Sequence, residues 1–426
     1  MMNTNERVEF LKNFDPEIAE LLQDEAVKQR STIGLIASEN VASPLSTCLE
    51  GCIFTNKNTE GYPGKRYVGG TENEDKVELI AIERLKKLFG CEHANVQSGN
   101  ATIANSAVFM GLMDPGDTVL SMSLNDGGHL SHGAQFHFSG KFYNIVQYGV
   151  RRTDCYIDMD EVREMAKKCH PRMIVCGGSS YPRLIDYKAF REIADEVGAY
   201  LWVDAAHVIG LIAGKVIPSP VPYADVVTFS TQKTLRGPRG CGVILCKKEL
   251  KNKIDRGVFP GIQGGPKADM IAARAVLFKE CMTKEYQSYQ MQVLKNAKAL
   301  AEGCRDEDLK LISGGTDTHL ALVKVTDYID SGREAELLLE TVGIITNKNL
   351  IPFDVLSSNL TSGIRIGSPL MTTRGVKERE MYEIGRLLGQ VLKCKEDKKR
   401  LEEIALQVQQ LAEAYPMFSE EWVPKI

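Results

Sequence analysis

The sequence lacks any long apolar run and any strong excess of charge, and each absence excludes a class of protein. No stretch approaches the roughly 20 consecutive apolar residues of a membrane-spanning helix. The first residues, MMNTNERVEFLKNF, contain no apolar segment of the kind found in secretory signal peptides. The formal net charge of -4 gives no reason to expect a nucleic acid or a membrane surface as a partner.

The cysteines also lack a pattern. The 11 cysteines are scattered, odd in number and without metal-ligand spacing, so we expect free thiols in a reducing cytoplasm. The remaining composition is ordinary for a globular protein, with 43% hydrophobic and 25% charged residues. A length of 426 residues predicts more than one domain.

Strand-like and helical segments alternate through the first half of the chain. Apolar runs at 143–149, 172–178 and 199–204 predict strands, and helical periodicity lies between them at 159–169 and 186–197. This alternation predicts an α/β fold with a mostly parallel sheet. A long helical stretch is expected from about 268 to 303, with mixed elements after it.

One lysine follows directly after a strand, in the stretch YADVVTFSTQKTLRGPRG at 223–240. We expect the strand at Ala224–Val227, and Lys233 lies in the loop that follows it. Upstream, AYLWVDAAHVIG carries Asp204 at the end of another strand. Pyridoxal phosphate requires such a pair, because the amine forms a Schiff base with the aldehyde and the carboxylate keeps the pyridine nitrogen protonated. The alternatives are a surface lysine and an aspartate that caps a helix.

Other segments offer groups for a phosphate and a carboxylate. The small residues Ser98–Thr102 precede a helix, whose free N–H groups and dipole favour an anion. Arg365, in SGIRIGSP, needs either an internal carboxylate or a substrate carboxylate as its partner. His129 follows two glycines and is placed either to stack on a cofactor ring or to make a structural hydrogen bond. Its spacing to His132 is that of a metal pair, but no third ligand lies nearby in the sequence, so we expect no metal site.

Together these stretches resemble the serine hydroxymethyltransferase family, pyridoxal-phosphate enzymes of the aspartate-aminotransferase type (fold type I). The motifs that carry the resemblance cover nearly the whole chain in family order: LIASEN, EGYPGKRY, GGHLSHG, VDAAHVIGL, KTLRGPRG, VFPGIQGGP, TNKN and TSGIRIGSP. The resemblance implies a mostly parallel seven-stranded sheet and a smaller C-terminal domain. The expected parts are a helical arm at 1–50, a large cofactor-binding domain at 51–285, and a small α+β domain at 286–426.

The resemblance also implies a role for individual residues. The catalytic residues would be Lys233, Glu60, His129, Asp204 and Tyr67. The cofactor would be bound by Lys233, Asp204, His207, His129, Ser179, Asn100, Ala101, Thr102, Gln232, Gly264 and Gly265. The amino acid and tetrahydrofolate would be bound by Ser38, Arg365, Glu60, Tyr67, Leu124, Leu130 and Asn349. Because Gly264 and Gly265 would reach the phosphate of a neighbouring subunit, the resemblance implies a homodimer, or a tetramer of two such dimers.

The sequence departs from the family pattern at several positions. Asn58 stands where the family has a tyrosine, Val68 where it has a second aromatic residue, and Gln232 where it has a histidine. The phosphate turn differs over Gly99–Thr102, and Cys241 is an additional residue after the lysine loop. Loss of two phenols would make the substrate end of the site larger and less polar.

The resemblance implies reversible cleavage of the Cα–Cβ bond of a small β-hydroxy amino acid, with transfer of the one-carbon unit to tetrahydrofolate. The departures leave alternatives open. One is a folate-independent enzyme with the same cofactor: an aldolase or transaldolase, a racemase, a decarboxylase or an aminotransferase. Another is a protein that has kept the fold for a binding or scaffolding role.

Overall fold

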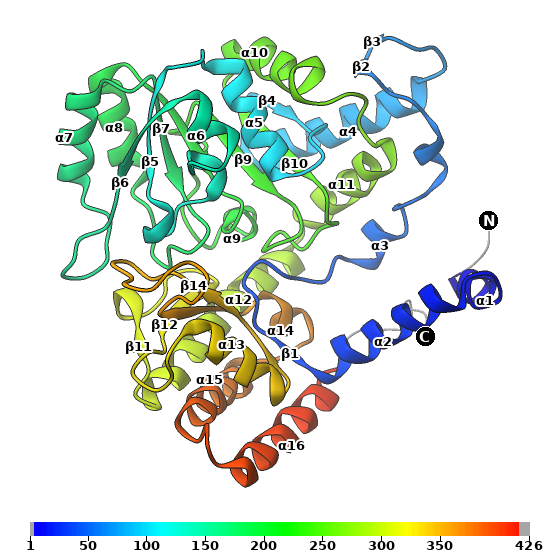
Figure 1. Cartoon of the computed structure of the whole chain (residues 1–426). Coiled ribbons are helices and arrows are strands. Elements are labelled where there is room, and N and C mark those ends of the chain that lie inside the picture. The colour runs from blue at the N-terminus through cyan, green and yellow to red at the C-terminus, as the bar shows by residue number, and fades with distance from the viewer. Residues whose placement is uncertain (1–3, 417–426) are drawn as a thin grey trace.

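A seven-stranded sheet forms the centre of the larger part of the molecule. The computed structural model describes residues 4–416 (Figure 1). The strands are β4 (His93–Asn95), β5 (Thr118–Met122), β6 (Asn144–Tyr148), β7 (Met173–Gly177), β8 (Tyr200–Asp204), β9 (Val226–Ser230) and β10 (Gly242–Cys246). Their spatial order is β4-β10-β9-β8-β7-β5-β6, and only β10 runs antiparallel to its neighbours. The predicted mostly parallel α/β sheet is therefore confirmed.

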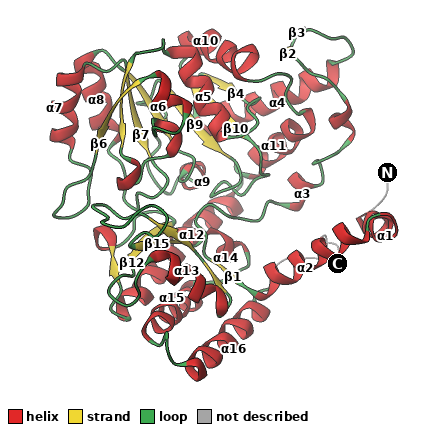
Figure 2. Ribbon diagram, viewed as in Figure 1, coloured by secondary structure: helices red, strands yellow, loops and turns green. Residues whose placement is uncertain are grey.

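Helices cover this sheet, as Figure 2 shows. They include α4 (Glu72–Phe89), α5 (Ala101–Leu112), α7 (Met159–Cys169), α8 (Tyr187–Val197) and α11 (Ala268–Glu280), with shorter helices α6 (Phe138–Phe142), α9 (Ile209–Ala213) and α10 (Lys251–Arg256). The strands between them are buried on both faces and are therefore continuously apolar. In β7, Ile174 and Cys176 join one hydrophobic cluster, whereas Met173 and Val175 join another.

A second, four-stranded antiparallel sheet belongs to the C-terminal part. It contains β11 (Lys310–Leu311), β12 (Leu320–Lys324), β15 (Gly363–Gly367) and β14 (Asn347–Asn349), in that order. Its helices are α12 (Lys284–Asp306), α13 (Gly332–Thr341), α14 (Pro369–Thr373), α15 (Glu378–Lys393) and α16 (Lys398–Ala414). Residues of these elements share one hydrophobic cluster, which includes Leu300, Val323, Ile364 and Leu388.

The N-terminal segment connects the two sheets. Helices α1 (Thr4–Phe14) and α2 (Pro16–Ser31) extend away from the body of the chain (Figure 1). Strand β1 (Ile33–Gly34) pairs in parallel with β13 (Ile344–Ile345), and α3 (Pro44–Thr47) follows. The loop expected at 55–70 contains a small hairpin, β2 (Gly61–Tyr62) and β3 (Lys65–Arg66). The three-part division of the chain stays a prediction.

The structure corrects two expectations and adds a strand. The strand expected at 224–227 lies at Val226–Ser230, so its hydroxyl residues belong to the strand. The long helical stretch expected from about 268 to 303 is divided into α11 and α12, because Thr283 caps α12 by accepting a hydrogen bond from the backbone N–H of Tyr286 (3.2 Å). Strand β10 was not anticipated. In the part of the chain described here, no helix combines the length and apolarity needed to cross a membrane.

Candidate active site

Asp204 lies buried at the carboxyl end of β8, where ligands gather in α/β sheets. Its Oδ2 accepts hydrogen bonds from Nδ2 of Asn105 (2.9 Å) and pairs with Nε2 of His132 (2.9 Å), and its Oδ1 accepts from the backbone N–H of Ala206 (3.0 Å). Burial alone would raise the pKa of Asp204, but the hydrogen bond and charge of His132 outweigh it and hold the pKa below its ordinary value. The carboxylate is therefore kept ionised.

His129 and His132 lie beside this carboxylate. Nδ1 of His129 is 2.6 Å from Oγ of Ser131, and Ser131 also accepts from Asn105 (2.8 Å). Burial lowers the pKa of His129 to about 4, with a further contribution from His132, so the ring is neutral near pH 7. His129, His132 and Asp204 each offer a ligand atom within 4.8 Å of the others. The expectation that no third ligand lies near the histidine pair was therefore wrong, although the same contacts are accounted for as a hydrogen-bonded network.

Lys233 lies in the turn after β9, partly buried. Its backbone oxygen accepts from the N–H of Arg236 (3.1 Å) and from Nδ2 of Asn40 (3.0 Å). Burial lowers the pKa of Lys233 to about 8; the charge of Asp204 opposes this, and those of Arg365 and Arg239 add to it. A lysine with this pKa has a sizeable fraction of free amine near neutral pH, as a nucleophile requires.

Asn40 holds the lysine turn against two helices of the C-terminal part. Its Nδ2 also donates to the hydroxyl of Tyr289 on α12 (2.9 Å), and its Oδ1 accepts from Oγ1 of Thr373 on α14 (2.7 Å). Arg236, which has a left-handed backbone (φ 66°), stacks 5.2 Å above the Tyr289 ring. Our sequence analysis missed Asn40, although it belongs to the quoted LIASEN motif.

Arg365 lies on β15 and reaches the larger sheet. Its guanidinium donates to the backbone oxygen of Ser179 (2.7 Å) and to Oδ1 of Asn347 (3.3 Å), while its buried Nε has no partner. Among the described residues it forms no ion pair with a carboxylate. Burial lowers the pKa of Arg365 to about 10, so it still carries its charge at neutral pH. Asn347 was missed; it lies on the same strand face as Asn349, two residues away.

His207 is buried just beyond the end of β8. Its Nδ1 lies 3.2 Å from Nε2 of His319, a second histidine that our sequence analysis did not identify. Burial lowers the pKa of His207 well below its ordinary value, and the charges of Lys233 and Arg365 lower it further. His207 is therefore a neutral ring close to two cations.

The phosphate turn precedes α5, as expected. Asn100 caps the helix, its Oδ1 accepting from the N–H of Ile103 (2.9 Å), and the first-turn N–H groups at Ala101 and Thr102 have no acceptor within the helix. Gln263 packs against this turn: its Oε1 accepts from the N–H of Gly99 (3.1 Å). The segment that carries Gly264 and Gly265 thus begins beside the phosphate turn of its own chain.

Glu60 lies against the two glycines. A Cβ atom on Gly265 would be 3.0 Å from Cγ of Glu60, and one on Gly264 would be 3.5 Å from its Oε1. Asn58 folds back, and its Oδ1 accepts from the backbone N–H of Glu60 (3.0 Å). Where the family has a phenol, this chain therefore has a short side chain bonded to its own loop.

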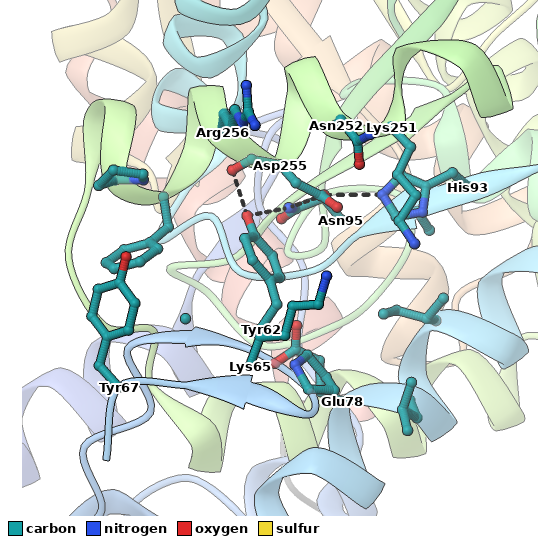
Figure 3. Close-up of a pocket in the computed structure, with 17 residues that line it drawn as sticks. Tyr62, Lys65, Tyr67, Glu78, His93, Asn95, Lys251, Asn252, Asp255 and Arg256 are labelled. Atoms are coloured by element: carbon teal, nitrogen blue, oxygen red, sulfur yellow. Dashed lines mark hydrogen bonds and ion pairs between the residues drawn. The ribbon is translucent and has the colours of Figure 1, made fainter.

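Tyr67 and Val68 are on the surface, with 72% and 37% of their area exposed. The Tyr67 ring packs edge-on against Phe259, with centroids 5.4 Å apart. Tyr67 and Phe259 line a cavity of about 640 Å³. Figure 3 shows that Tyr62, Asn95, His93 and Asp255 hydrogen-bond to one another on one side of it. Lys233, Asp204 and Arg365 do not line this cavity.

The remaining predicted residues have few specific contacts. Ser38 is partly buried and follows Leu35, whose backbone oxygen accepts from Gly367 at the end of β15 (2.7 Å). Leu124 is partly buried and Leu130 is 38% exposed, in the loop around His129. Asn349 donates to the backbone of Leu350 (2.6 Å). Oε1 of Gln232 is buried without a partner.

The structure thus gathers the predicted residues into two groups. The first contains Lys233, Asp204, His129, His207, Arg365 and Ser179, which are joined by hydrogen bonds and by the charges that shift their pKa values. The second contains Glu60, Tyr67, Gly264 and Gly265. Within residues 4–416, no hydrogen bond or ion pair connects the second group with Lys233, Asp204 or Arg365.

The residues of the first group fit pyridoxal phosphate. A lysine with a lowered pKa and an ionised buried aspartate supply the two groups that its ring needs. Buried side-chain atoms around them lack partners, namely Oε1 of Gln232, Oγ of Ser98, Oγ of Ser230, Oδ1 of Asn105 and Nε of Arg365. Unpaired buried polar atoms are rare in proteins, and a polar ligand accounts for several at once.

Comparison with known proteins agrees with this geometry. The sequence model of a family described as "Serine hydroxymethyltransferase" matches residues 11–388 of the 426, well over half of the chain. Its members are pyridoxal-phosphate-dependent transferases of fold type I, in keeping with the seven-stranded sheet and the lysine in the turn after β9. The protein is therefore a pyridoxal-phosphate-dependent transferase that belongs to the serine hydroxymethyltransferase family.

Proposed function

We propose that the protein transfers the hydroxymethyl group of serine to tetrahydrofolate and releases glycine, reversibly. The observation that carries the proposal is Arg365, a partly buried cation whose Nε is buried and which, among the described residues, has no hydrogen bond at Nε and no carboxylate partner; it is close enough to Lys233 to lower its pKa. A guanidinium in this state suits the carboxylate of an amino acid, which it can bind through two hydrogen bonds.

The first group of residues prepares the chemistry. Bound pyridoxal phosphate supplies a ring that withdraws electrons from the substrate Cα. Lys233 would hold the cofactor covalently, and its lowered pKa keeps part of the amine unprotonated. Asp204, ionised and fixed by Asn105 and His132, would hold a proton on the pyridine nitrogen. The neutral His129 would cover one face of the ring.

The second group would act on the other end of the substrate. Glu60 would move a proton at the oxygen of the hydroxymethyl group, and Gly264 and Gly265 would offer backbone N–H groups to the phosphate. Because no hydrogen bond or ion pair joins this group to Lys233 within residues 4–416, we propose a homodimer in which each subunit completes the site of the other. The partly buried Leu124, the exposed Leu130 and Asn349 would contact tetrahydrofolate, with Tyr67. We also propose a cytoplasmic location, supported by the 11 free cysteines.

The test is a turnover assay with the purified, cofactor-loaded protein. We expect glycine to form from serine only when tetrahydrofolate is present. The matched control is Arg365→Ala, which should retain the bound cofactor and lose most of the glycine formation. A wild-type protein that binds the cofactor stoichiometrically and forms no glycine would contradict the proposal.

A second function is favoured by one specific observation. Asn58 is turned onto the backbone of Glu60, and Val68 has no polar group to offer, so two phenols of the family pattern are absent from the substrate end. The candidate is folate-independent cleavage or another Cα reaction on a bulkier amino acid. Turnover of a β-branched hydroxy amino acid at the same rate with and without tetrahydrofolate would establish it and displace the first proposal.

A further inference from the structure

A buried arginine lies behind the turn that precedes α5. Arg274, in the middle of α11, keeps 1% of its exposed area and is one of the largest fully buried side chains of the chain. Within residues 4–416 it forms no ion pair with a carboxylate. Burying a charge without an ionic partner is costly, so other groups must offset the cost.

Backbone carbonyl groups take the place of that partner. Nη1 of Arg274 donates to the backbone oxygen of Val96 and to that of Gly242 (3.2 Å), and it lies 3.5 Å from the backbone oxygen of Ser98. Nε donates to the backbone oxygen of Met270, one turn earlier in α11 (3.0 Å). The guanidinium thus joins the segment after β4 to the first residue of β10.

Gln263 binds the carbonyl group between those of Val96 and Ser98. Its Nε2 donates to the backbone oxygen of Gln97 (2.7 Å), and its Oε1 accepts from the N–H of Gly99 (3.1 Å). Three consecutive carbonyl oxygens are therefore engaged by side chains of the protein. A carbonyl oxygen directed at an anion would repel it, so engaging these oxygens leaves the first-turn N–H groups of α5 as the groups offered to an anion.

Gly242 brings the start of β10 against the same turn. Its N–H donates to the backbone oxygen of Ser98 (2.9 Å), and a Cβ atom on it would lie 2.2 Å from the backbone oxygen of Asn100. The guanidinium of Arg274 therefore lies behind the backbone that carries the cap of α5. At this separation its positive charge acts on the same site as the positive end of the helix dipole.

The charge of Arg274 has no anionic partner that would cancel it. Burial raises the pKa of Glu78, and the charges of Arg66 and Arg274 oppose this rise. Glu78 is not available to Arg274, because its two oxygens accept from Arg66 (2.6 Å) and from Gln97 (2.8 Å). Oγ of Ser98 is fully buried and, among the described residues, has no hydrogen-bond partner. A cation behind the turn and an unpaired hydroxyl within it both suit an anion.

We propose that Arg274 is a positioning residue for the cofactor phosphate. It fixes the carbonyl groups of the turn from behind and adds a permanent positive charge to the site, without contact with the phosphate. The inference rests on binding of pyridoxal phosphate at the turn before α5, as the proposed function requires, and not on which amino acid is the substrate.

The test compares pyridoxal phosphate with pyridoxal, which has the same ring and aldehyde but no phosphate. Dissociation constants at pH 7 follow from the visible absorbance of each bound compound in the full-length protein. Arg274→Gln keeps N–H donors but loses the charge, so pyridoxal phosphate should bind about 10- to 50-fold more weakly, while pyridoxal changes less than about twofold. Arg274→Lys keeps the charge and should bind pyridoxal phosphate within about threefold of wild type.

Three results would overturn the proposal. They are unchanged binding of pyridoxal phosphate in Arg274→Gln, equal weakening of both compounds, and equal weakening in the Gln and Lys variants. The matched control is Arg84→Gln, because Arg84 also donates to a backbone oxygen of α11, that of Ala275 (2.5 Å). This control should leave both dissociation constants unchanged.

A second measurement does not require the Gln variant to fold. Phosphorus-31 NMR of the wild-type holoenzyme against pH reports the charge of the bound phosphate, whose second pKa is about 6 in a free phosphate ester. With a cation behind the turn, the phosphate should stay doubly charged from pH 8 down to about 5.5. A bound phosphate that titrates at about pH 6 or above overturns the proposal. Serine turnover enters neither measurement, so failure of the proposed function and failure of this inference are separate results.

Discussion

The two groups of predicted residues differ in how completely one chain builds them. Around Lys233, the functional side chains are buried or partly buried, and those of Asp204 and Arg365 each hydrogen-bond to two or more partners from different segments. Around Glu60, Asn58 bonds to its own loop, and Tyr67 is 72% exposed. The departures Asn58 and Val68 lie in this second group. Under the proposed function, the residues for cofactor chemistry would be preformed in one chain, whereas the substrate end would depend on the exposed loop.

The largest expected effect comes from removing the lysine of the preformed group. Lys233→Ala should lower glycine formation by at least about 10³-fold, because the variant loses the covalent hold on the cofactor and the amine that exchanges with substrate. Mass spectrometry after borohydride reduction should show no cofactor on the chain. The control is Lys188→Ala, whose side chain is 71% exposed. Undiminished turnover in Lys233→Ala would show that Lys233 is not required for activity and would contradict the contrast between the two groups.

Acid should destabilise the preformed group before the exposed loop. His129, His207 and His319 have pKa values lowered from about 6.5, so the unfolded chain takes up protons that the folded chain refuses. The stabilising contribution of these histidines is fully present above pH 6.5 and is lost as the pH drops toward 4. For each histidine, the folding equilibrium constant falls by up to about tenfold per pH unit. Unfolding by urea between pH 7 and 4.5 measures this, and His319→Gln should reduce the slope. A flat profile would contradict the buried neutral rings.

Arg365→Lys tests the carboxylate-binding cation. Lysine keeps the charge but loses the fork that binds a carboxylate through two bonds, so KM for serine should rise about 10- to 100-fold while the cofactor stays bound. Steady-state kinetics separates KM from kcat. Arg400→Lys, on an exposed helix end, should change neither value. An unchanged KM in Arg365→Lys would remove the main support for an amino-acid carboxylate at this position.

Gly265→Ala perturbs the second group without touching the first. The added Cβ would lie 3.0 Å from Cγ of Glu60, so the carboxylate side chain must shift. We expect about a tenfold loss of turnover, in line with the sensitivity of catalysis to small displacements. Gly69→Ala is the matched control, since no heavy atom lies within 4 Å of its added Cβ. Equal activity of the two variants would show that the position of Glu60 is unimportant.

The smallest effect is expected from Val68→Tyr, which restores one aromatic residue of the family pattern. One regained hydrogen bond corresponds to about fivefold in kcat/KM for serine. Competition between serine and a bulkier hydroxy amino acid provides the measurement. If the variant loses activity toward serine, the loop has adapted to another substrate, and the second candidate function gains support.

Much of this architecture could be predicted from local patterns. Apolar runs and helical periodicity placed β7, β8, α7 and α8 within one or two residues, because these elements are buried strands and amphipathic helices. Strand β10 escaped because it directly follows a turn rich in glycine and proline. The division between α11 and α12 escaped because the helical pattern continues across the break.

Some site residues have a local signal in the sequence and others do not. Lys233 and Asp204 were recognisable because Asp204 ends a strand and Lys233 lies in the turn after one, and parallel strands bring their carboxyl ends together. Asn105, Asn347 and His319 were not, because their roles depend on partners 99, 18 and 112 residues away in the sequence. No local pattern indicates which distant side chain a buried polar group will meet.

The hydrogen bonds through which Asn40 holds the lysine turn join residues that are synthesised at different times. The turn at Lys233 is held by Asn40, which is synthesised before it, and by Tyr289 and Thr373, which are synthesised after it. At about 5–20 residues per second, roughly 7 to 28 s separate the synthesis of Lys233 from that of Thr373. The strand that carries Arg365 is synthesised only near the end of that interval. In the life of each molecule, the lysine thus exists before the arginine that would bind the substrate carboxylate.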